Sequence, residues 1–418
     1  MRSNDIFAYA EFKVQPLCRL ASSLKQGSTC RFLIGLSIES DDEIEWVLWS
    51  LYTGYGSTLE EISSKLLESE AAALNYVRKN FPLTAGLIYT NLESSTKTND
   101  VGIPYILMSK ATGFPLQRVW KSTRFGQTEL PAGMKAKILF QLGSIAFKLS
   151  QLRLESIRSL IEQNGSFRVG ESLSRDHILH ERYSLDNVPR GPFSSETQFY
   201  DSLIEVLIQH AEPLPLSHHC FVAPVPRREL YDFSGLYNKA CDLWNDFVMV
   251  GCKIDSSDNR LDYIIAAEAL RDMVPRWLQY IPKLDSNSFP LCHSDLSVNN
   301  IYIDNNYDIT CIIDWAFCSS VPEAMALIPS WIATVASRVS KLFQQRDCAC
   351  SLNRFLNFDS IDDYSLFTTV WEQIYGTEKD SMSYLSEQRL LCYNIERYKE
   401  IQVSDQPTER IESGARLL

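Results

Sequence analysis

Four polar residues between positions 293 and 314 have the types and the spacing that phosphoryl transfer requires. His293, Asp295 and Asn300 form the pattern H-x-D-x-x-x-x-N, and Asp314 follows the apolar run Cys311–Ile313. Phosphoryl transfer needs a carboxylate near the attacking hydroxyl and oxygen ligands that hold Mg²⁺ against the phosphates. We therefore expect Asp295 to face the acceptor and Asn300 and Asp314 to reach one cation.

Each of these residues alone is compatible with an ordinary role, such as capping a turn or solvating a loop. The joint pattern is more specific because strand-like segments flank it. Ile301–Ile303 and Ile309–Ile313 are short apolar runs separated by the turn Asp304–Asn306, so they predict a hairpin. Such a hairpin would bring Asn300, at its start, close to Asp314, at its end.

The segment before residue 110 is predicted to form strands and one helix. Residues 12–50 are expected to be strands, among them the runs Arg31–Ile38 and Ile44–Leu48 on either side of a polar turn. A helix is predicted over Thr58–Arg78, where apolar side chains recur at helical spacing. Ile103–Met108 is the next buried strand, and the residues up to Gly113 end it.

From about residue 134 the apolar pattern is helical. Helices are predicted around 138–149, 199–207 and 261–273, and Pro275 is expected to end or kink the last of them. The stretch Gly165–Pro192 is expected to be a long loop. This order predicts an α+β protein with two lobes. A small β-rich N-lobe would span residues 1–110, and a larger, mostly helical C-lobe would span residues 111–418.

The stretch HSDLSVNN, followed by CIIDW, resembles the catalytic loop and the metal-binding motif of the aminoglycoside phosphotransferase and choline kinase family, especially its large fungal branch. The resemblance implies a two-lobed, protein-kinase-like fold. Protein kinases have DFG where this chain has Asp314-Trp315-Ala316, and the long helical insert matches small-molecule kinases better. By resemblance, Asp295 is the catalytic base or orienting carboxylate, His293 braces the loop, and Asn300 and Asp314 are the metal ligands.

Three other segments resemble parts of that family's nucleotide site. Residues 102–116 resemble the hinge strand, whose backbone can pair with the adenine edge, although a plain strand end is the alternative. Glu70, on the predicted helix, resembles the glutamate that pairs with an ATP-holding lysine in that family. The alternative is that Glu70 is an ordinary solvated charge on the helix surface. The segment that contains Gly27 and Ser28 occupies the place of the family's phosphate loop. A single glycine is a weak signal for such a loop. The nucleotide-binding residues so predicted are Gly27, Ser28, Glu70, Met108, Ser109, Lys110 and Ala111.

One position departs from the family pattern. The family has a lysine or arginine near the end of the third strand, and Trp49 occupies that place in the run Glu45–Ser50. A tryptophan has one N–H donor and no charge, so we do not expect it to neutralise phosphates or to pair with Glu70. A shift in the alignment is the alternative explanation. The candidates for a substitute cation are Lys25, Arg31 and Lys65.

The composition limits the partners and the cellular compartment that we expect for the protein. The chain of 418 residues has a formal net charge of −12, which disfavours non-specific binding to nucleic acid because it repels the phosphate backbone. We expect no membrane span and no secretory signal, because the chain lacks a long apolar run and a basic, then apolar N-terminus. The 11 cysteines contain no CxxC pair. They are expected to be buried free thiols, which favours the cytoplasm.

Three functions are compatible with these patterns. The favoured one is an ATP- and Mg²⁺-dependent O-phosphotransferase that acts on a small-molecule acceptor, because Asp295, Asn300 and Asp314 are all present. The second is a pseudokinase, or a kinase-fold binding or regulatory protein with impaired transfer, which Trp49 favours. A protein kinase is the third, and the missing DFG and APE motifs disfavour it. The acceptor and any protein partners are not identified by the sequence.

Overall fold

The computed structural model describes most of the chain, which divides into two compact units. The described residues are 13–26, 29–33, 37–40, 45–50, 57–81, 83–84, 87–91, 99–120, 130–163, 166–212, 214, 216, 228, 233–235, 237–238, 241–242, 257–280, 288–326, 341–357 and 363–392. The first unit comprises Met1–Ser174, Asn287–Pro322 and Ala326–Val335, and the second comprises Arg175–Ser286, Glu323–Met325 and Ala336–Leu418. The lobe boundary expected between residues 110 and 111 lies inside the first unit and stays a prediction.

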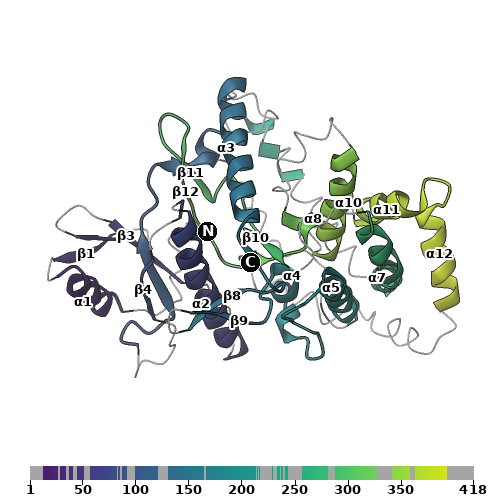
Figure 1. The fold of residues 1–418 in the computed structure, drawn as a ribbon, viewed down its shortest axis with the longest axis horizontal. Helices are drawn as coiled ribbons and strands as arrows, with labels where there is room; N and C mark the ends of the chain where they lie inside the picture. The colour runs from purple at the N-terminus through teal and green to yellow at the C-terminus, as the bar shows by residue number, and fades with distance from the viewer. Residues whose placement is uncertain are drawn as a thin grey trace. The chain divides into compact units, whose positions relative to one another are not determined.

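The first unit begins with a five-stranded antiparallel sheet (Figure 1). Its strands are β1 (Cys30–Leu33), β2 (Ser37–Ser40), β3 (Glu45–Trp49), β4 (Leu87–Asn91) and β5 (Tyr105–Ser109), in the order β1-β2-β3-β5-β4. Helix α1 (Val14–Leu24) packs against β1 and β2. Helix α2 (Ser57–Asn80) follows β3 in the sequence and packs against β4 and β5. The sheet therefore holds β3 between two neighbours, β2 and β5.

Alternation along β3 directs its two tryptophans to opposite faces of the sheet. Trp46 and Leu48 are buried in a cluster with Leu17 of α1. Trp49 instead packs against a second cluster, which includes Leu67 of α2. Successive side chains of a strand point to opposite faces, so a separation of three residues places Trp46 and Trp49 on different sides. The end of β3 thus presents Trp49 to the side of the sheet on which α2 lies.

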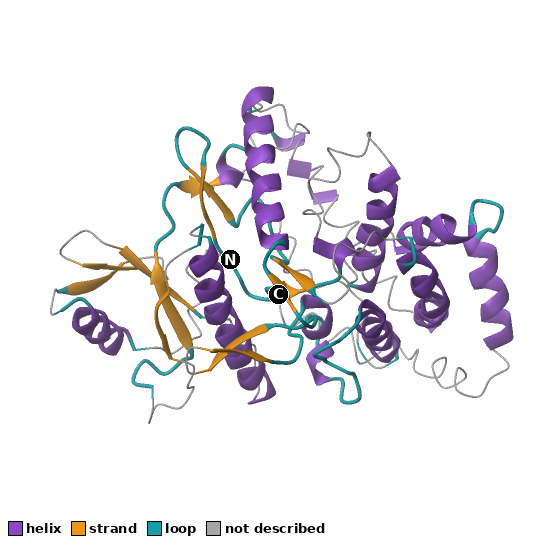
Figure 2. Cartoon of the chain, in the orientation of Figure 1, coloured by secondary structure: helices purple, strands orange, loops and turns teal. Residues whose placement is uncertain are grey.

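Small sheets and one long helix complete the first unit (Figure 2). Helix α3 (Ala132–Ser150) buries Ile138, Leu142, Ile145 and Leu149, as predicted. The predicted hairpin is also confirmed, because β11 and β12 pair antiparallel. The small sheets consist of β6 (Phe114–Pro115), β11 (Ile301–Ile303) and β12 (Ile309–Ile312); of β7 (Arg153–Leu154), β10 (Phe289–Cys292) and β13 (Ser319–Ser320); and of β8 (Leu160–Gln163) and β9 (Ser166–Val169).

Gly113 allows β6 to approach this hairpin closely. Its φ is +91°, a value that favours glycine, and a Cβ there would lie 2.2 Å from the carbonyl oxygen of Ile303. Directly after this turn, Phe114 pairs with Ile303 across the β6–β11 ladder. A glycine is therefore required where the chain passes from β5 to the small sheet.

The second unit is mainly helical within the residues described. Its longer helices are α5 (Glu196–Ala211), α7 (Ser257–Leu278), α10 (Lys341–Leu356), α11 (Asp363–Tyr375) and α12 (Ser381–Cys392). The short helices among the described residues are η1 (Leu116–Arg118), α4 (Arg175–Ile178), η3 (Arg182–Ser184) and α8 (Glu323–Ala326). With strands concentrated early in the chain and helices later, the predicted α+β class is confirmed.

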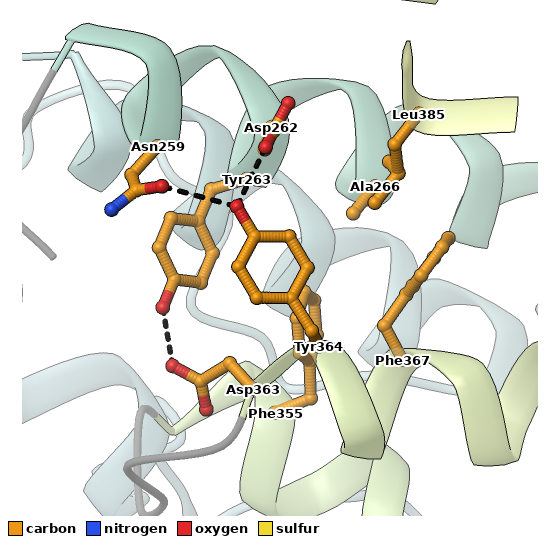
Figure 3. A pocket seen from close by; sticks show the side chains of 9 residues that line it. All are labelled: Asn259, Asp262, Tyr263, Ala266, Phe355, Asp363, Tyr364, Phe367 and Leu385. Carbon is orange, nitrogen blue, oxygen red and sulfur yellow. Dashed lines mark hydrogen bonds between the residues drawn. The ribbon is translucent and has the colours of Figure 1, made fainter. Parts of the chain in front are cut away.

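A cavity of about 60 Å³ lies among α7, α10, α11 and α12 (Figure 3). Tyr263 donates a hydrogen bond to Asp363. Asp262 accepts one from Tyr364, at 2.6 Å, and another from Nε of Arg389, at 2.9 Å. These polar groups therefore bond one another around the cavity. Its lining residues are Asn259, Asp262, Tyr263, Ala266, Phe355, Asp363, Tyr364, Phe367 and Leu385; the predicted site residues are not among them.

Two predictions about the N-terminal strands are wrong. Residues 12–50 are not all strands, because Val14–Leu24 forms α1. Leu17 and Ala21 are buried four residues apart, which is a helical repeat. The run Arg31–Ile38 is not one strand but parts of β1 and β2, with Leu33 opposite Ser37. The sequence has Gly35 inside that run, and an isolated glycine weakens a strand prediction.

The stretch Gly165–Pro192 is not a structureless loop, because it contains β9, α4 and η3. The Arg190 guanidinium donates to the carbonyl oxygens of His177, at 2.8 Å, and Arg182, at 2.9 Å. One half-buried side chain thus ties together backbone groups of α4 and η3. Pro275 does not end α7, which continues to Leu278, since a proline near the last turn removes only one backbone donor.

Two further expectations concern burial and membranes. The described cysteines are free thiols, as predicted, but only some are buried: Cys318, Cys348 and Cys392 are buried, for example, whereas Cys18 and Cys350 are half-buried. Among the described helices, none combines the length and the apolar character that a membrane span would need.

Candidate active site

Asp314 lies two residues after the end of β12 in a backbone conformation that is uncommon for residues other than glycine. Its φ is +63°, and such a left-handed conformation costs about 1–2 kcal/mol for a residue with a Cβ. The peptide groups on both sides of it are held. Nε2 of His293 bonds to the carbonyl oxygen of Ile313 at 3.1 Å, and the Trp315 N–H donates to Oε1 of Glu70 at 3.2 Å. The direction of the Asp314 side chain is therefore set by two other elements.

His293 follows β10 and is buried as a neutral imidazole. Its Nδ1 accepts a hydrogen bond from the Asp295 N–H at 3.1 Å, so the ring proton lies on Nε2, which donates to Ile313. Burial lowers the pKa of His293 to about 4, and the ring is uncharged at neutral pH. The ring also packs edge-on against Trp315, with ring centroids 4.6 Å apart. His293 thus joins the loop 293–300 to the residues around Asp314.

The Asn300 amide connects the two carboxylates of the site. Its Nδ2 donates to the backbone oxygen and to Oδ2 of Asp295, both at 3.0 Å, and lies 3.5 Å from Oδ2 of Asp314. The Ile313 N–H donates to the carbonyl oxygen of Asn300 at 3.0 Å, directly beyond the β11–β12 ladder. The hairpin therefore brings Asp295, Asn300 and Asp314 together.

The oxygen donors around Asp314 fit a hard divalent cation. At nucleotide sites Mg²⁺ is bound by one or two protein oxygens, and phosphate oxygens and water complete its coordination. The Asp314 carboxylate supplies one such donor. Because Nδ2 of Asn300 is directed to Asp295, Oδ1 of the same amide is left to supply a second. Asp314 and Asn300 could therefore hold Mg²⁺ with these side chains.

Glu70 is a buried carboxyl group on α2, with 1% of its surface exposed. Its Oε2 accepts a hydrogen bond from the indole Nε1 of Trp49 at 2.9 Å, and its Oε1 accepts the bond from Trp315. Burial and the nearby charge of Asp314 raise the pKa of Glu70 to about 8, although the two hydrogen bonds act in the opposite direction. In the absence of a bound cation, Glu70 is therefore mainly protonated at neutral pH.

Trp49 is the last residue of β3, opposite Ile106 of β5. The expectation that this side chain would not pair with Glu70 is wrong, because the indole N–H reaches the carboxyl group and donates to it. The pairing is a hydrogen bond with a neutral donor. Trp49 therefore binds Glu70 without supplying a positive charge.

The three candidate substitute cations have other surroundings. Lys65 forms an ion pair with Glu171 at 2.9 Å, and Nζ of Lys25 lies 5.7 Å from the ring centroid of Trp46. Arg31 is exposed on β1. Lys65 and Lys25 thus make contacts with Glu171 and Trp46.

The predicted hinge residues lie at the end of β5, where Met108 is buried and Lys110 is exposed. The Lys110 N–H donates to the carbonyl oxygen of Glu45 at 3.1 Å, and its Nζ binds the Glu45 carboxylate. This N–H is therefore used within the sheet. If these residues contact adenine, they would use polar groups of Ser109, Lys110 and Ala111 other than the Lys110 N–H.

Some site features had a signal in the sequence and others did not. The backbone groups of Ile313 and Trp315 that fix Asp314 were not predicted, because any residue type carries them. The bond between Trp49 and Glu70 was not predicted, although the indole N–H is a hydrogen-bond donor that can reach a carboxyl group. Gly27 and Ser28, the predicted phosphate-loop residues, lie outside the described residues.

Comparison with solved structures returns small-molecule kinases at low similarity. A proposed aminoglycoside phosphotransferase from Ralstonia eutropha is 9% identical, with a TM-score of 0.41, 87% of this chain and 98% of that chain covered. A proposed fructosamine-3-kinase from Thermobifida fusca is 12% identical, with a TM-score of 0.38, 86% of this chain and 98% of that chain covered. The choline kinase LicA from Streptococcus pneumoniae is 13% identical, with a TM-score of 0.34, 93% of this chain and 98% of that chain covered.

No protein-family model matches the sequence, and no curated protein matches it. The structural similarities are too weak to assign a function, which depends on the residues of the site itself.

Proposed function

We propose that the protein is an ATP- and Mg²⁺-dependent phosphotransferase that phosphorylates a hydroxyl group of a small molecule. The convergence of Asp295, Asn300 and Asp314 carries the proposal, with Nδ2 of Asn300 within 3.5 Å of both carboxylates. Phosphoryl transfer needs one carboxylate for the acceptor and oxygen donors for the metal. In protein kinases a lysine on the third strand pairs with a glutamate on the following helix. The positions of Trp49 and Glu70 support a related, protein-kinase-like arrangement.

In the proposed reaction Asp295 orients the acceptor hydroxyl. The hydroxyl oxygen bonds to the γ-phosphorus of ATP while the bond from that phosphorus to the bridging oxygen of ADP breaks, and the hydroxyl proton passes to Asp295. The Asn300 amide holds the Asp295 carboxylate during this step. Mg²⁺, held by Asn300 and Asp314, would neutralise the charge on the phosphates.

Residues Met108 to Ala111 are proposed to contact the nucleotide, and Gly27 and Ser28 the phosphates. The motif HSDLSVNN supports a relationship to aminoglycoside phosphotransferases and choline kinases, and the fungal branch rests on that resemblance alone. A small-molecule acceptor and a cytoplasmic location are part of the same proposal.

The bond between Trp49 and Glu70 favours a second candidate function. A protein that binds nucleotide but lacks the basic residue on β3 would stabilise the phosphate charge less and transfer phosphate poorly. Such a protein would be a regulatory or binding protein with a kinase-like fold. The two functions differ in turnover and agree in nucleotide binding.

Release of ADP, measured with a panel of amino alcohols, amino sugars and aminoglycosides, separates the two. We expect turnover in the wild type and a loss of about 100- to 10,000-fold in Asp295→Asn, with Mg·ATP affinity nearly unchanged, because the carboxylate acts mainly in the transition state. Asp308→Asn, on the same hairpin and paired with Lys137 at 2.7 Å, is the matched control. Wild-type turnover in Asp295→Asn, or a loss of its ATP binding, would contradict the assigned role.

A further inference from the structure

The peptide groups that flank Asp314 are held by side chains from two separate elements. On one side His293, after β10, binds the carbonyl oxygen of Ile313. On the other side Glu70, on α2, binds the N–H of Trp315. Asp314 itself has a φ of +63°, in the left-handed region that few residues other than glycine adopt. Each contact holds one of the two peptide groups whose orientations define the backbone conformation of Asp314.

Glu70 is in turn fixed by Trp49. The indole N–H of Trp49 binds one carboxyl oxygen at 2.9 Å, and the N–H of Trp315 binds the other at 3.2 Å. With 1% of its surface exposed, Glu70 would lose hydrogen bonds that water cannot replace if either donor were removed. Trp49, Glu70 and the Trp315 N–H therefore form a continuous link, the Glu70 bridge, from β3 through α2 to the residue after Asp314.

We propose that the Glu70 bridge positions Asp314 for metal binding, so that Glu70 is a positioning residue here and not the partner of an ATP-holding lysine. This inference rests on the proposed function as far as the metal is concerned. A lysine in place of Trp49 would divide its contacts between Glu70 and the phosphates. The indole has a single N–H, and Glu70 occupies it. The bridge is therefore complete in the protein without nucleotide.

Two variants test the bridge without relying on enzymatic activity. Glu70→Met keeps a similar volume and removes both acceptors, and Trp49→Phe removes only the indole donor. Trp46→Phe is the matched control, because it makes the same change on the same strand but on the opposite face, in the cluster around Leu17. The measurement is hydrogen exchange at the Trp315 amide in the protein without nucleotide and metal.

We expect hydrogen exchange at the Trp315 amide to become at least about ten-fold faster in Glu70→Met. The increase should be smaller in Trp49→Phe, and the rate should stay unchanged in Trp46→Phe. Unchanged exchange in a folded Glu70→Met protein would overturn the bridge. If Glu70→Met does not fold, Trp49→Phe decides the question by the same measurement.

Binding of Mn²⁺ in the presence of ADP tests the positioning role. Glu70→Met should weaken Mn²⁺ binding by about 10- to 100-fold, as is usual for groups that orient a metal ligand. In an Asp314→Ala background the same substitution should have no further effect, since the ligand that it orients is gone. An additive loss in the double variant would show that Glu70 acts elsewhere. Absence of Mn²⁺ binding in the wild type would instead count against the proposed function. The Glu70 bridge would then still be tested by the hydrogen exchange of the Trp315 amide.

Discussion

At the end of β3, a neutral indole stands where the resemblance leads us to expect a lysine or an arginine. The consequence for Glu70 is direct. A carboxyl group beside a cation would be ionised, whereas burial and the nearby charge of Asp314 raise the pKa of Glu70 to about 8, and the hydrogen bond from the Trp49 indole offsets only part of this rise. The neutral donor on β3 thus leaves the buried carboxyl group on α2 mainly protonated at neutral pH in the absence of a bound cation.

The raised pKa of Glu70 predicts how stability depends on pH without Mg²⁺. Between its ordinary pKa of 4.5 and its folded value of about 8, Glu70 binds a proton in the folded protein and loses it on unfolding. The free energy of unfolding should therefore fall with rising pH in this window, by up to about 1.4 kcal/mol for each pH unit. Urea unfolding between pH 5 and 9 would measure this fall in the wild type relative to Glu70→Gln. The same pH dependence in both proteins would contradict a protonated Glu70.

Restoring a cation at position 49 tests what its loss costs. We expect Trp49→Lys to tighten Mg·ATP binding, because a charged donor beside Glu70 and the phosphates gains on the order of 1.5–3 kcal/mol. The void left by the indole would subtract from this gain. Calorimetry on folded protein measures the affinity, with Trp49→Phe as the uncharged control. Unchanged or weaker binding in Trp49→Lys would mean that another cation already serves the phosphates.

At the scale of elements, two connections bring the site together. The β11–β12 hairpin sets Asn300 against Asp314, and the turn at Gly113 brings β6 onto β11. The hairpin was predictable because two apolar runs flank an Asp-Asn-Asn turn. The strand split at residues 33 to 37 and the helix α1 were not predicted, because short apolar runs fit a strand or a helix equally well until their partners are known.

The Gly113 turn predicts a local loss of stability on substitution. In Gly113→Ala the new methyl group would lie 2.2 Å from the Ile303 carbonyl oxygen, at a φ of +91°. We expect destabilisation by about 2 kcal/mol or more, measured by urea unfolding. Gly376→Ala is the matched control, since Gly376 has a φ of +77° and nothing within 4 Å of the position of its Cβ. It should lose only about 1 kcal/mol, for the backbone strain alone. Equal losses would show that the contact with Ile303 does not matter.

For the molecule as a whole, sequence patterns with several coupled residues predicted more than single residues did. The strands and helices that hold Asp295, Asn300 and Asp314 could be predicted because their spacing, their flanking runs and their chemistry agree. The contact of Glu70 with the Trp315 N–H could not be predicted, because it depends on the packing of α2 against a segment distant in the sequence. The acidic composition disfavours non-specific binding to nucleic acid, and the thiols favour a reducing compartment. Neither feature identifies the acceptor.

The central claim is that Asp314 and Asn300 bind the metal of a nucleotide site. Calorimetric titration of ATP, with and without Mg²⁺, tests it in the wild type and in Asp314→Ala, with Asp308→Ala as the control on the same hairpin. We predict Mg²⁺-dependent ATP binding in the wild type and in Asp308→Ala, and loss of the Mg²⁺ dependence in a folded Asp314→Ala protein. Equal Mg²⁺-dependent binding in Asp314→Ala and the wild type would contradict the assignment of this site.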